Sequence, residues 1–160
     1  MGSGKSAVGK QLARRLQRPF IDSDAEIERR TGVDIPQIFE REGEPGFRQR
    51  ECAVIADLLQ RSGVVLATGG GAVLLEANRR ALQQGGTVIY LETSVSQQVE
   101  RVGRSEHRPL LRGAPDLVAT LSALLAQRAP LYAAVAAITV ATDGQQVQQV
   151  VDAILRQLPE

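Results

Sequence analysis

The sequence predicts an α/β protein in which helices flank a parallel β-sheet, and three observations support this fold class. Short apolar runs alternate with longer stretches of helical periodicity along the 160 residues, as they do when crossover helices join parallel strands. Residues 2–6 read Gly-Ser-Gly-Lys-Ser and come directly before a helical pattern. Residues 69–71 are three glycines at the end of an apolar run. A chain of this length is expected to form one domain, residues 1–160.

The elements of the first half are predicted by the spacing of their apolar residues. Apolar residues four apart predict a helix, and short apolar runs bounded by glycine, proline or polar residues predict strands. Glycines interrupt the long helical region twice. These rules give a helix on Val8, Leu12 and Leu16, a strand at 19–22, helical patterns from 24 to about 60 with breaks near Gly32 and at 43–46, and a buried strand at 64–68.

The second half follows the same alternation. Its last helix has the clearest apolar face of the chain, and a polar stretch containing glycine and arginine separates two helical patterns. We expect a strand at 87–91, a helix from about 94 to 102, the polar stretch at 103–116, a helix beginning with Leu117 and Leu121, a strand at 138–141, and a final helix on Val147, Val150, Val151, Ile154, Leu155 and Leu158.

The start of the chain contains the second half of a phosphate-binding loop, whose full pattern is G-x-x-x-x-G-K-[ST]. In this loop the backbone N–H groups surround phosphates, Lys5 reaches the outer phosphates, and the Ser6 hydroxyl is available to Mg²⁺. The loop also begins a helix, whose N-terminus favours anions. These residues predict an enzyme that uses a nucleoside triphosphate.

The first glycine of this loop, and the strand that normally feeds it, would precede Met1. Such a strand usually lies in the interior of a doubly wound sheet. Four strands are visible in the sequence, and the loop implies a fifth. We therefore expect the first strand to be missing, with two unpaired sheet edges facing each other and a hole in the core. Met1 is interpreted as an internal methionine.

Composition narrows the class of protein. A net charge of +1 gives no general attraction to nucleic acid or to a membrane surface. We see no apolar run long enough to span a bilayer and no signal peptide. The single cysteine, Cys52, suits a reducing compartment. We expect a cytoplasmic protein. Seventeen of the nineteen basic residues are arginines, which recognise phosphate and carboxylate through two parallel hydrogen bonds.

Two carboxylates, Asp22 and Asp24, follow the predicted strand at 19–22. Strand ends line the ligand crevice in open α/β sheets, and residues two apart lie on one side of an extended segment. This pair could hold a magnesium ion and a substrate hydroxyl. Alternatively, Ser23 or Asp24 could be the N-cap of the next helix, and the two roles are compatible.

The three glycines at 69–71 would expose consecutive backbone N–H groups to an anion. A plain tight turn is the alternative. Two arginines, Arg48 after Phe47 and Arg128 before a Pro-Leu-Tyr motif, stand near the ends of expected elements. Neither arginine indicates a function by itself.

Taken together, these motifs resemble the shikimate kinase family over essentially the whole chain. Their order and spacing are far more specific than any one of them. The motifs are residues 2–6, Asp22-Ser23-Asp24 with Glu26 and Ile27, Phe47-Arg48 with Glu51, residues 69–71, Arg108-Pro109-Leu110-Leu111, and Arg128 with Pro130-Leu131-Tyr132.

The resemblance implies a P-loop kinase with a parallel sheet of the nucleoside-monophosphate-kinase type, five-stranded in the family. It implies a substrate-binding helical segment over about 24–60 and a mobile lid over about 103–116. The reaction would transfer the γ-phosphoryl group of ATP to the 3-hydroxyl of shikimate, on the way to chorismate and the aromatic amino acids. Mg²⁺ would be the cofactor, ATP and shikimate the ligands, and the protein a monomer.

The resemblance also implies roles for the catalytic residues. Lys5 and Ser6 would hold phosphates and magnesium, with Asp22 behind the metal. Asp24 would bind the shikimate hydroxyls and orient or deprotonate the attacking one. Arginines around Asp24 are expected to favour its charged form. Arg108 would move in with the lid to meet the γ-phosphate.

The remaining implied roles concern the two substrates. Arg48 and Arg128 would bind the shikimate carboxylate, Gly70 and Gly71 would complete that pocket, and Glu51 would fix Arg48. Arg101 would lie against the adenine, and the segment 142–145 would flank it. The implied ATP-binding residues are Gly2, Ser3, Gly4, Lys5, Ser6, Arg101, Arg108 and Gln145.

Two alternatives remain open. The chain could be another small-molecule kinase of this fold, such as a gluconate kinase or a nucleotide kinase. A nucleotide kinase should show a base-binding pocket, which we do not find. The chain could instead be a catalytically silent kinase-like binding module, although Lys5, Asp24 and Arg108 speak against loss of activity.

Overall fold

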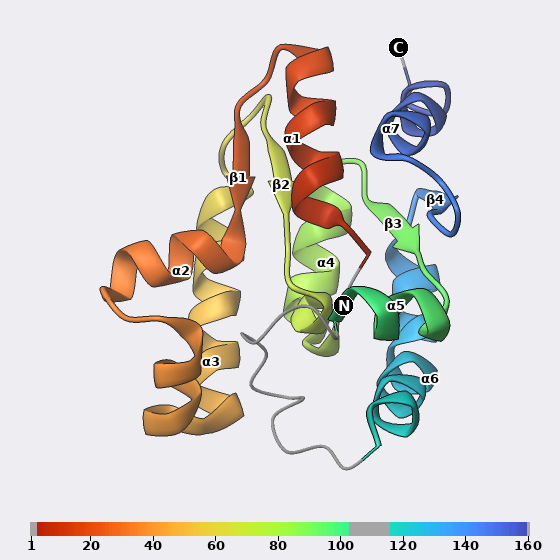
Figure 1. The fold of residues 1–160 in the computed structure, drawn as a ribbon. Helices are drawn as coiled ribbons and strands as arrows, with labels where there is room; N and C mark the ends of the chain where they lie inside the picture. Colours follow the sequence, from red (N-terminus) through yellow and green to blue (C-terminus); the bar gives the residue numbers. More distant parts are fainter. Residues whose placement is uncertain (1–2, 103–115, 160) are drawn as a thin grey trace.

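A computed structural model describes residues 3–102 and 116–159. Helices pack around short parallel strands, as Figure 1 shows. In chain order the elements are α1 (Lys5–Leu16), β1 (Phe20–Asp22), α2 (Ser23–Thr31), α3 (Ile35–Leu58), β2 (Val65–Ala67), the 3₁₀ helix η1 (Gly70–Leu74), α4 (Glu76–Gly85), β3 (Ile89–Glu92), α5 (Val95–Val102), α6 (Leu117–Val135), β4 (Ile138–Ala141) and α7 (Val147–Leu155).

The four strands of the described chain form two separate pairs. Strand β1 lies parallel to β2, with Ile21 opposite Leu66, and β3 lies parallel to β4, with Tyr90 opposite Thr139. No pairing joins β2 to β3 within the described residues. The predicted parallel α/β architecture is confirmed. The predicted interruption in the middle of the sheet is present as well.

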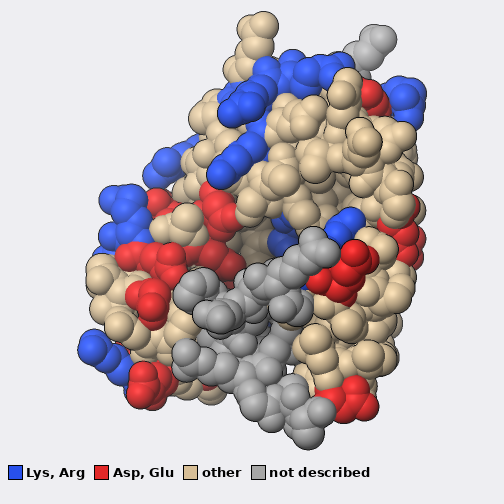
Figure 2. Space-filling model, viewed as in Figure 1, with Lys and Arg blue, Asp and Glu red and all other residues tan. Residues whose placement is uncertain are grey.

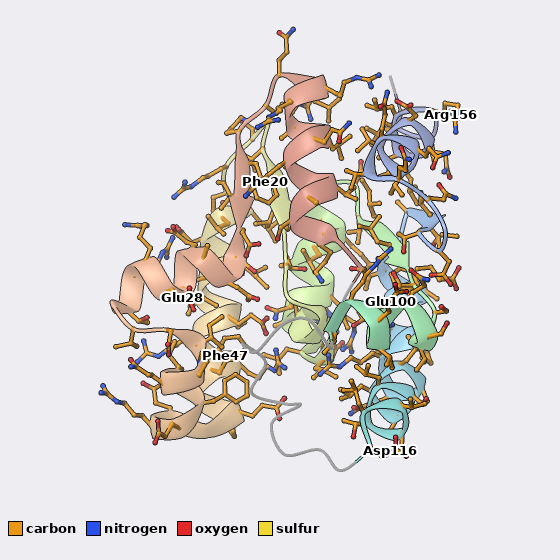
Figure 3. The ribbon with its side chains drawn as sticks, in the orientation of Figure 1. Phe20, Glu28, Phe47, Glu100, Asp116 and Arg156 are labelled. Carbon is orange, nitrogen blue, oxygen red and sulfur yellow. The ribbon has the colours of Figure 1, made fainter. Side chains whose placement is uncertain are left out.

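Two apolar clusters form the core of the described residues. One joins α1, β4 and α7, and the other joins α2 and α3. Between β1 and α1, the Phe20 ring occupies the space where a side chain on Gly9 would be, so a glycine is needed there (Figure 3). The buried residues of the first cluster are Val8, Leu12, Ile138, Val140, Val150, Val151 and Ile154, and those of the second are Ile27, Ile38, Phe47, Val54 and Leu58.

The two predicted breaks in the helical region 24–60 are confirmed, and glycine makes both. Helix α2 ends at Gly32, whose φ of 73° is left-handed, a conformation that costs glycine little. Gly43, with φ 69° and ψ −177°, interrupts α3 and is followed by Pro45. The second half of α3, after this kink, carries Phe47, Arg48 and Glu51.

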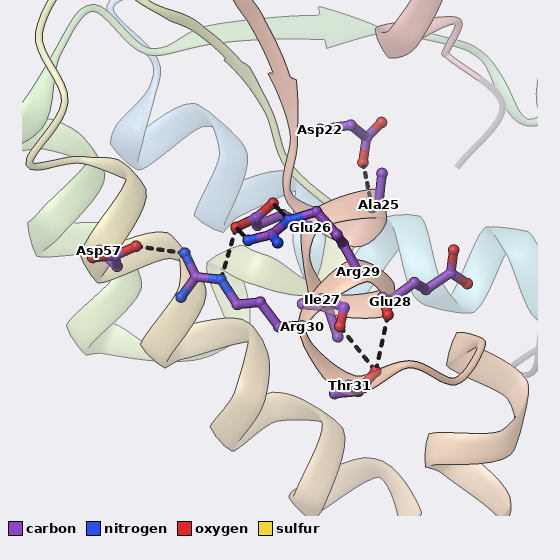
Figure 4. Close-up of polar contacts among 9 residues, drawn as sticks. All are labelled: Asp22, Ala25, Glu26, Ile27, Glu28, Arg29, Arg30, Thr31 and Asp57. Atoms are coloured by element: carbon purple, nitrogen blue, oxygen red, sulfur yellow. Dashed lines mark hydrogen bonds and ion pairs between the residues drawn. The ribbon is translucent and has the colours of Figure 1, made fainter.

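An ion-pair network fixes α2 on α3 (Figure 4). The Glu26 carboxylate accepts hydrogen bonds from Arg29 at 2.8 Å and from Arg30 at 2.8 Å, and Arg30 also pairs with Asp57 of α3. These hydrogen bonds lower the pKa of Glu26 to about 2. Thr31 closes the last turn of α2 by donating to the Ile27 carbonyl at 2.9 Å. Glu26, part of the family motif, thus has a structural role here.

Three features differ from the expectations. Helix α4 was not predicted, because its ten residues contain few large apolar side chains. The glycines at 69–71 lead into η1 instead of a simple turn. Helix α6, at 19 residues, is long and apolar enough by length and composition to cross a membrane, which corrects the expectation that no run reaches that length. Its Arg128 is buried within the fold and only 4% exposed.

Candidate active site

The phosphate-binding loop leads into α1 as the sequence predicts. Gly4 is the N-cap residue, with a left-handed φ of 77°, which only glycine adopts at low cost. Lys5 and Ser6 therefore stand in the first turn, where the unpaired N–H groups of a helix attract anions. Ser3 is buried, while Gly2 lies outside the described residues.

Ser6 and Asp22, the two predicted magnesium residues, are brought together. The Ser6 hydroxyl donates to the Asp22 carboxylate over 2.9 Å. The other carboxylate oxygen of Asp22 accepts from the backbone N–H groups of Asp24 at 2.9 Å and Ala25 at 3.3 Å. Asp22 is thus the N-cap of α2, in place of Ser23 or Asp24 as the alternative had it. Capping holds the carboxylate beside Ser6.

This pair fits a magnesium ion in its donor chemistry. Mg²⁺ takes oxygen ligands, keeps several waters, and is commonly bound through one or two carboxylates together with substrate phosphates. A serine hydroxyl and one carboxylate beside a phosphate loop satisfy that description. In the described part of the chain, no group of three or more His, Cys, Asp or Glu side chains is arranged so that it could hold a metal ion.

Asp24 lies deeper, at the carboxyl end of β1. Burial and the neighbouring Asp22 raise its pKa, while Lys5 and Arg48 lower it less. Arg48 favours the charged form of Asp24, as expected, but burial and Asp22 outweigh this effect. One carboxylate oxygen, Oδ1, is buried without a hydrogen-bond partner among the described residues. A carboxylate in this state is a better base than a solvated one.

Arg48 extends from α3 over the glycine segment. Its guanidinium donates to Glu51 at 2.7 Å and to the more exposed Glu44 at 3.1 Å. The guanidinium also fills the space where a Cβ on Gly71 would be, so a side chain there would displace Arg48. Gly71 thus sets the position of Arg48.

Arg128, on α6, approaches the same segment from the other side. Its Nε is buried and has no partner among the described residues. Tyr132, one turn further on, hydrogen-bonds Arg128 and donates to the Gly70 carbonyl over 2.7 Å. The Tyr132 ring stacks on Tyr90 with centroids 4.9 Å apart.

Glu51 lies between the two arginines. Burial raises its pKa, and both Arg48 and Arg128 act in the opposite direction. A Cβ built on Gly69 would be 3.1 Å from Glu51 Oε1 and 3.2 Å from Asp24 Oδ1. The glycine thus lets both carboxylates approach the backbone. The structure therefore joins Asp24, Arg48, Arg128 and the glycines in one site.

This site has unused hydrogen-bonding capacity. Within the described residues, four buried side-chain polar atoms have no partner, and three of them belong to Asp24, Glu51 and Arg128. Buried polar atoms normally find partners, so an unpaired cluster indicates where a polar ligand binds. Figure 2 shows a hollow on this face, with Lys or Arg side chains inside it and Asp and Glu side chains beside it.

The residues expected to contact the adenine make fewer contacts with one another than those of the carboxylate site. Arg101, at the end of α5, acts electrostatically on Asp143, whose carboxylate accepts from the Ser94 backbone N–H at 3.0 Å. Asp143 lies within the segment 142–145, so Arg101 is close to this segment. Gln145 is exposed, and its N–H donates to the Thr142 carbonyl. Arg108 and most of the expected lid lie outside the described residues.

Sequence reasoning missed two contacts. One is the hydrogen bond by which Tyr132 holds the Gly70 carbonyl. The four-residue spacing of Arg128 and Tyr132 places both on one helix face, and this signal could have suggested a shared site. The other is the buried hydroxyl pair of Thr93 and Thr142, 2.6 Å apart, which joins the ends of β3 and β4. Nothing in the local sequence distinguishes these threonines from others.

Comparison with solved structures supports the same fold. A shikimate kinase from Acinetobacter baumannii, solved in complex with shikimate, superposes with a TM-score of 0.95 at 47% identity, over 98% of this chain and 87% of that one. A gluconokinase from Sinorhizobium meliloti has a TM-score of 0.63 at 22% identity, over 98% of this chain and 86% of that one. The second likeness shows the fold alone.

Sequence comparison gives the family. A shikimate kinase from Pseudomonas syringae pathovar tomato is 55% identical over 160 residues, which are all of this chain and 92% of the relative. The profile of the shikimate kinase family matches residues 1–159. This chain belongs to the shikimate kinase family.

Proposed function

We propose that this protein transfers the γ-phosphoryl group of ATP to the 3-hydroxyl of shikimate. One observation beyond family membership carries the proposal. Two buried arginines, Arg48 and Arg128, flank a site in which Asp24 has an unpaired carboxylate oxygen. The site opens beside Lys5, a phosphate-loop residue close enough to lower the pKa of Asp24. A carboxylate-bearing alcohol matches this arrangement of charges.

Asp24 orients the attacking hydroxyl and accepts its proton. The raised pKa of Asp24 makes its ionised form a stronger base. Phosphoryl transfer has a loose transition state, so positioning and charge stabilisation account for most of the catalysis. Lys5 supplies positive charge at the outer phosphates. Arg108, which lies outside the described residues, is the residue proposed to add a second positive charge at the γ-phosphate.

Ser6 and Asp22 are the residues proposed to hold Mg²⁺. The hydroxyl would ligate the ion directly, and the carboxylate would act behind it or through water. When bound, magnesium neutralises charge developing on the β- and γ-phosphate oxygens. The protein contributes the fixed position of both oxygens, because the Asp22 carboxylate is held by two backbone N–H groups of α2.

Arg48 and Arg128 bind the substrate carboxylate, with Gly70 and Gly71 forming the floor of the pocket. Each charged hydrogen bond contributes about 1.5–3 kcal/mol. Glu51 keeps the two guanidinium groups together before the substrate arrives. In this proposal residues 24–60 form the substrate-binding segment, and Arg101 with 142–145 and Gln145 flanks the adenine.

We further propose that the enzyme acts as a cytoplasmic monomer without a nucleic-acid or membrane partner. A near-neutral net charge of +1 supports this proposal. The burial of Arg128 in α6 supports a packed helix in place of a membrane span.

The decisive experiment measures ADP release from MgATP in the presence of shikimate, gluconate or a nucleoside monophosphate. Release with shikimate alone is the expected result. Release with gluconate alone would overturn the assignment of the arginine pair to shikimate. A complementary measurement is shikimate binding by calorimetry without ATP, which tests the carboxylate site separately from turnover.

A further inference from the structure

The Tyr132 hydroxyl joins helix α6 to the glycine segment against which Arg48 lies. It donates a hydrogen bond to the Gly70 carbonyl over 2.7 Å, although the two residues are 62 positions apart in the chain. The next residue, Gly71, lies directly beneath the Arg48 guanidinium, which fills the space that a Cβ would take. The place of the Gly70 carbonyl therefore also decides where Arg48 finds its packing surface.

The same hydroxyl interacts with Arg128, one helical turn earlier on α6. Residues four apart in a helix share one face, and a phenol hydroxyl can donate one hydrogen bond while it accepts another. Tyr132 can thus donate to the Gly70 carbonyl and accept from Arg128 together. Burial raises the pKa of Tyr132, and Arg128 and Arg48 lower it less. The hydroxyl therefore keeps its proton and remains a donor at neutral pH.

The ring of Tyr132 is held from the side by Tyr90 of β3. The two rings stack with centroids 4.9 Å apart and an interplanar angle of 25°. Stacking restricts the ring, so the hydroxyl has a defined position. Among the described residues the Tyr90 hydroxyl has no hydrogen-bond partner of its own. The two tyrosines therefore share one stack, but they differ in what their hydroxyl groups contact.

The other end of η1 is held by helix α4. Asn78, only 1% exposed, donates to the Ala72 carbonyl at 3.0 Å, and Arg79 donates to the two carbonyls that follow. The short helix η1 is thus anchored on α4 at its end and on α6 at its beginning. The Tyr132 hydroxyl makes the second of these anchors, on the helix that carries Arg128.

We propose that Tyr132 is a positioning residue for the substrate carboxylate, because its hydroxyl fixes the separation between the guanidinium groups of Arg48 and Arg128. It holds the glycine segment on which Arg48 packs, and it holds Arg128 on its own helix. A carboxylate that is shared by two guanidinium groups needs both at the correct distance together. Tyr132 acts through the two arginines and does not touch the substrate. This inference rests on the proposed function, since it requires an alcohol that carries a carboxylate.

The test compares Tyr132→Phe with Tyr90→Phe. Each variant removes one phenol hydroxyl and keeps both rings of the stack, so the pair is matched in size and chemistry. Shikimate binding is measured by calorimetry without ATP, and steady-state kinetics give kcat and the KM for each substrate. Both substitutions are repeated in an Arg128→Lys background, and the Tm of every variant is recorded.

Tyr132→Phe is expected to raise the Kd and the KM for shikimate by about 5- to 10-fold, the range for one lost hydrogen bond. The KM for ATP should stay unchanged, and kcat should fall by less than about 3-fold. Tyr90→Phe should change the shikimate values by less than about 2-fold. In the Arg128→Lys background, Tyr132→Phe should add less than about 2-fold, because the separation it maintains no longer serves a planar pair of donors.

A lower Tm in Tyr132→Phe with an unchanged Kd and KM for shikimate would show that the hydroxyl is structural and would overturn the inference. Equal effects from the two phenylalanine variants would also overturn it, and so would full additivity with Arg128→Lys. A failure of the unmodified protein to bind shikimate would instead overturn the proposed function, and this inference would fall with it.

Discussion

The Glu51 carboxylate lies 2.7 Å from the Arg48 guanidinium and is completely shielded from solvent. Arg48 itself is only 11% exposed at its side chain. An ion pair in this setting costs desolvation of both groups, which is consistent with the raised pKa of Glu51. We therefore infer that this ion pair contributes to substrate binding more than to the stability of the fold. It holds a guanidinium at the floor of the site, where a substrate carboxylate can share it.

Replacing Glu51 by glutamine is expected to raise the shikimate KM by at least about 10-fold, equivalent to about 1.4 kcal/mol, with a smaller change in kcat. The neutral amide no longer offsets the charges of Arg48 and Arg128, so the two guanidinium groups repel each other in the empty site. Steady-state kinetics with each substrate varied will measure the effect.

Glu44→Gln is the matched control for this variant. Glu44 is the other carboxylate bound to Arg48, at 3.1 Å, but its side chain is 44% exposed. Exposed ion pairs contribute about 0–1 kcal/mol, so KM should change less than about 5-fold. Equal effects from Glu44→Gln and Glu51→Gln would contradict the specific role of the buried carboxylate.

Replacing Arg48 by lysine is expected to raise the shikimate KM by about 10- to 100-fold and to leave the ATP KM nearly unchanged. Lysine keeps the charge but loses the planar pair of donors that matches a carboxylate. Arg50→Lys, on the exposed pair with Glu42, is the control and should behave like wild type. An unchanged shikimate KM in Arg48→Lys would remove this residue from the pocket.

Asp24→Asn is expected to reduce kcat by about 1,000-fold, within the range for loss of a general base, while ATP binding persists. In the unmodified enzyme kcat/KM for shikimate should fall as pH drops through the raised pKa of Asp24. Below that pKa the carboxylate carries a proton and cannot accept another. An equal loss of nucleotide binding, measured by calorimetry, would show that Asp24 is structural.

The same substitution is expected to raise the Tm at neutral pH. Because the pKa of Asp24 is raised in the folded state, the folded protein keeps a proton that the unfolded chain releases near 3.8. Stability therefore falls as pH rises from that value through the folded pKa, and it stays lower above it. Asparagine removes this cost. The gain in Tm should shrink as the pH approaches 4, and a constant gain at all pH values would contradict the argument.

Much of this site was predictable because its residues stand where strands end and helices begin. Asp22 and the glycines at 69–71 stand at the ends of apolar runs, and the phosphate loop begins α1, so topology places all three on one edge of the sheet. The convergence of Arg48 and Arg128 was available only through the family resemblance. The two arginines stand on α3 and α6. No local sequence pattern predicts that the kink at Gly43 and the buried turn of α6 direct both side chains toward Glu51.

The sign of the Asp24 pKa shift was not predictable for a related reason. The sequence supplies the charged residues expected around Asp24, and Lys5 and Arg48 do lower its pKa. Burial, which outweighs them, depends on how completely α2, α3 and the glycine segment enclose the carboxylate. Helix α4 was missed because packing, not its own apolar periodicity, stabilises it.

Gly71→Ala offers a test of the site that changes no charged group. A methyl group at this position would overlap the Arg48 guanidinium, and Arg48 would have to move away from the substrate carboxylate. We expect the shikimate KM to rise by about 10-fold or more, with the ATP KM unaffected. Gly86→Ala is the control, because a Cβ there meets nothing within 4 Å.

The double variant Gly71→Ala with Arg48→Lys should be less impaired than the sum of the two single effects, since both act through one guanidinium. Additive losses would show that Gly71 affects the substrate by a route independent of Arg48.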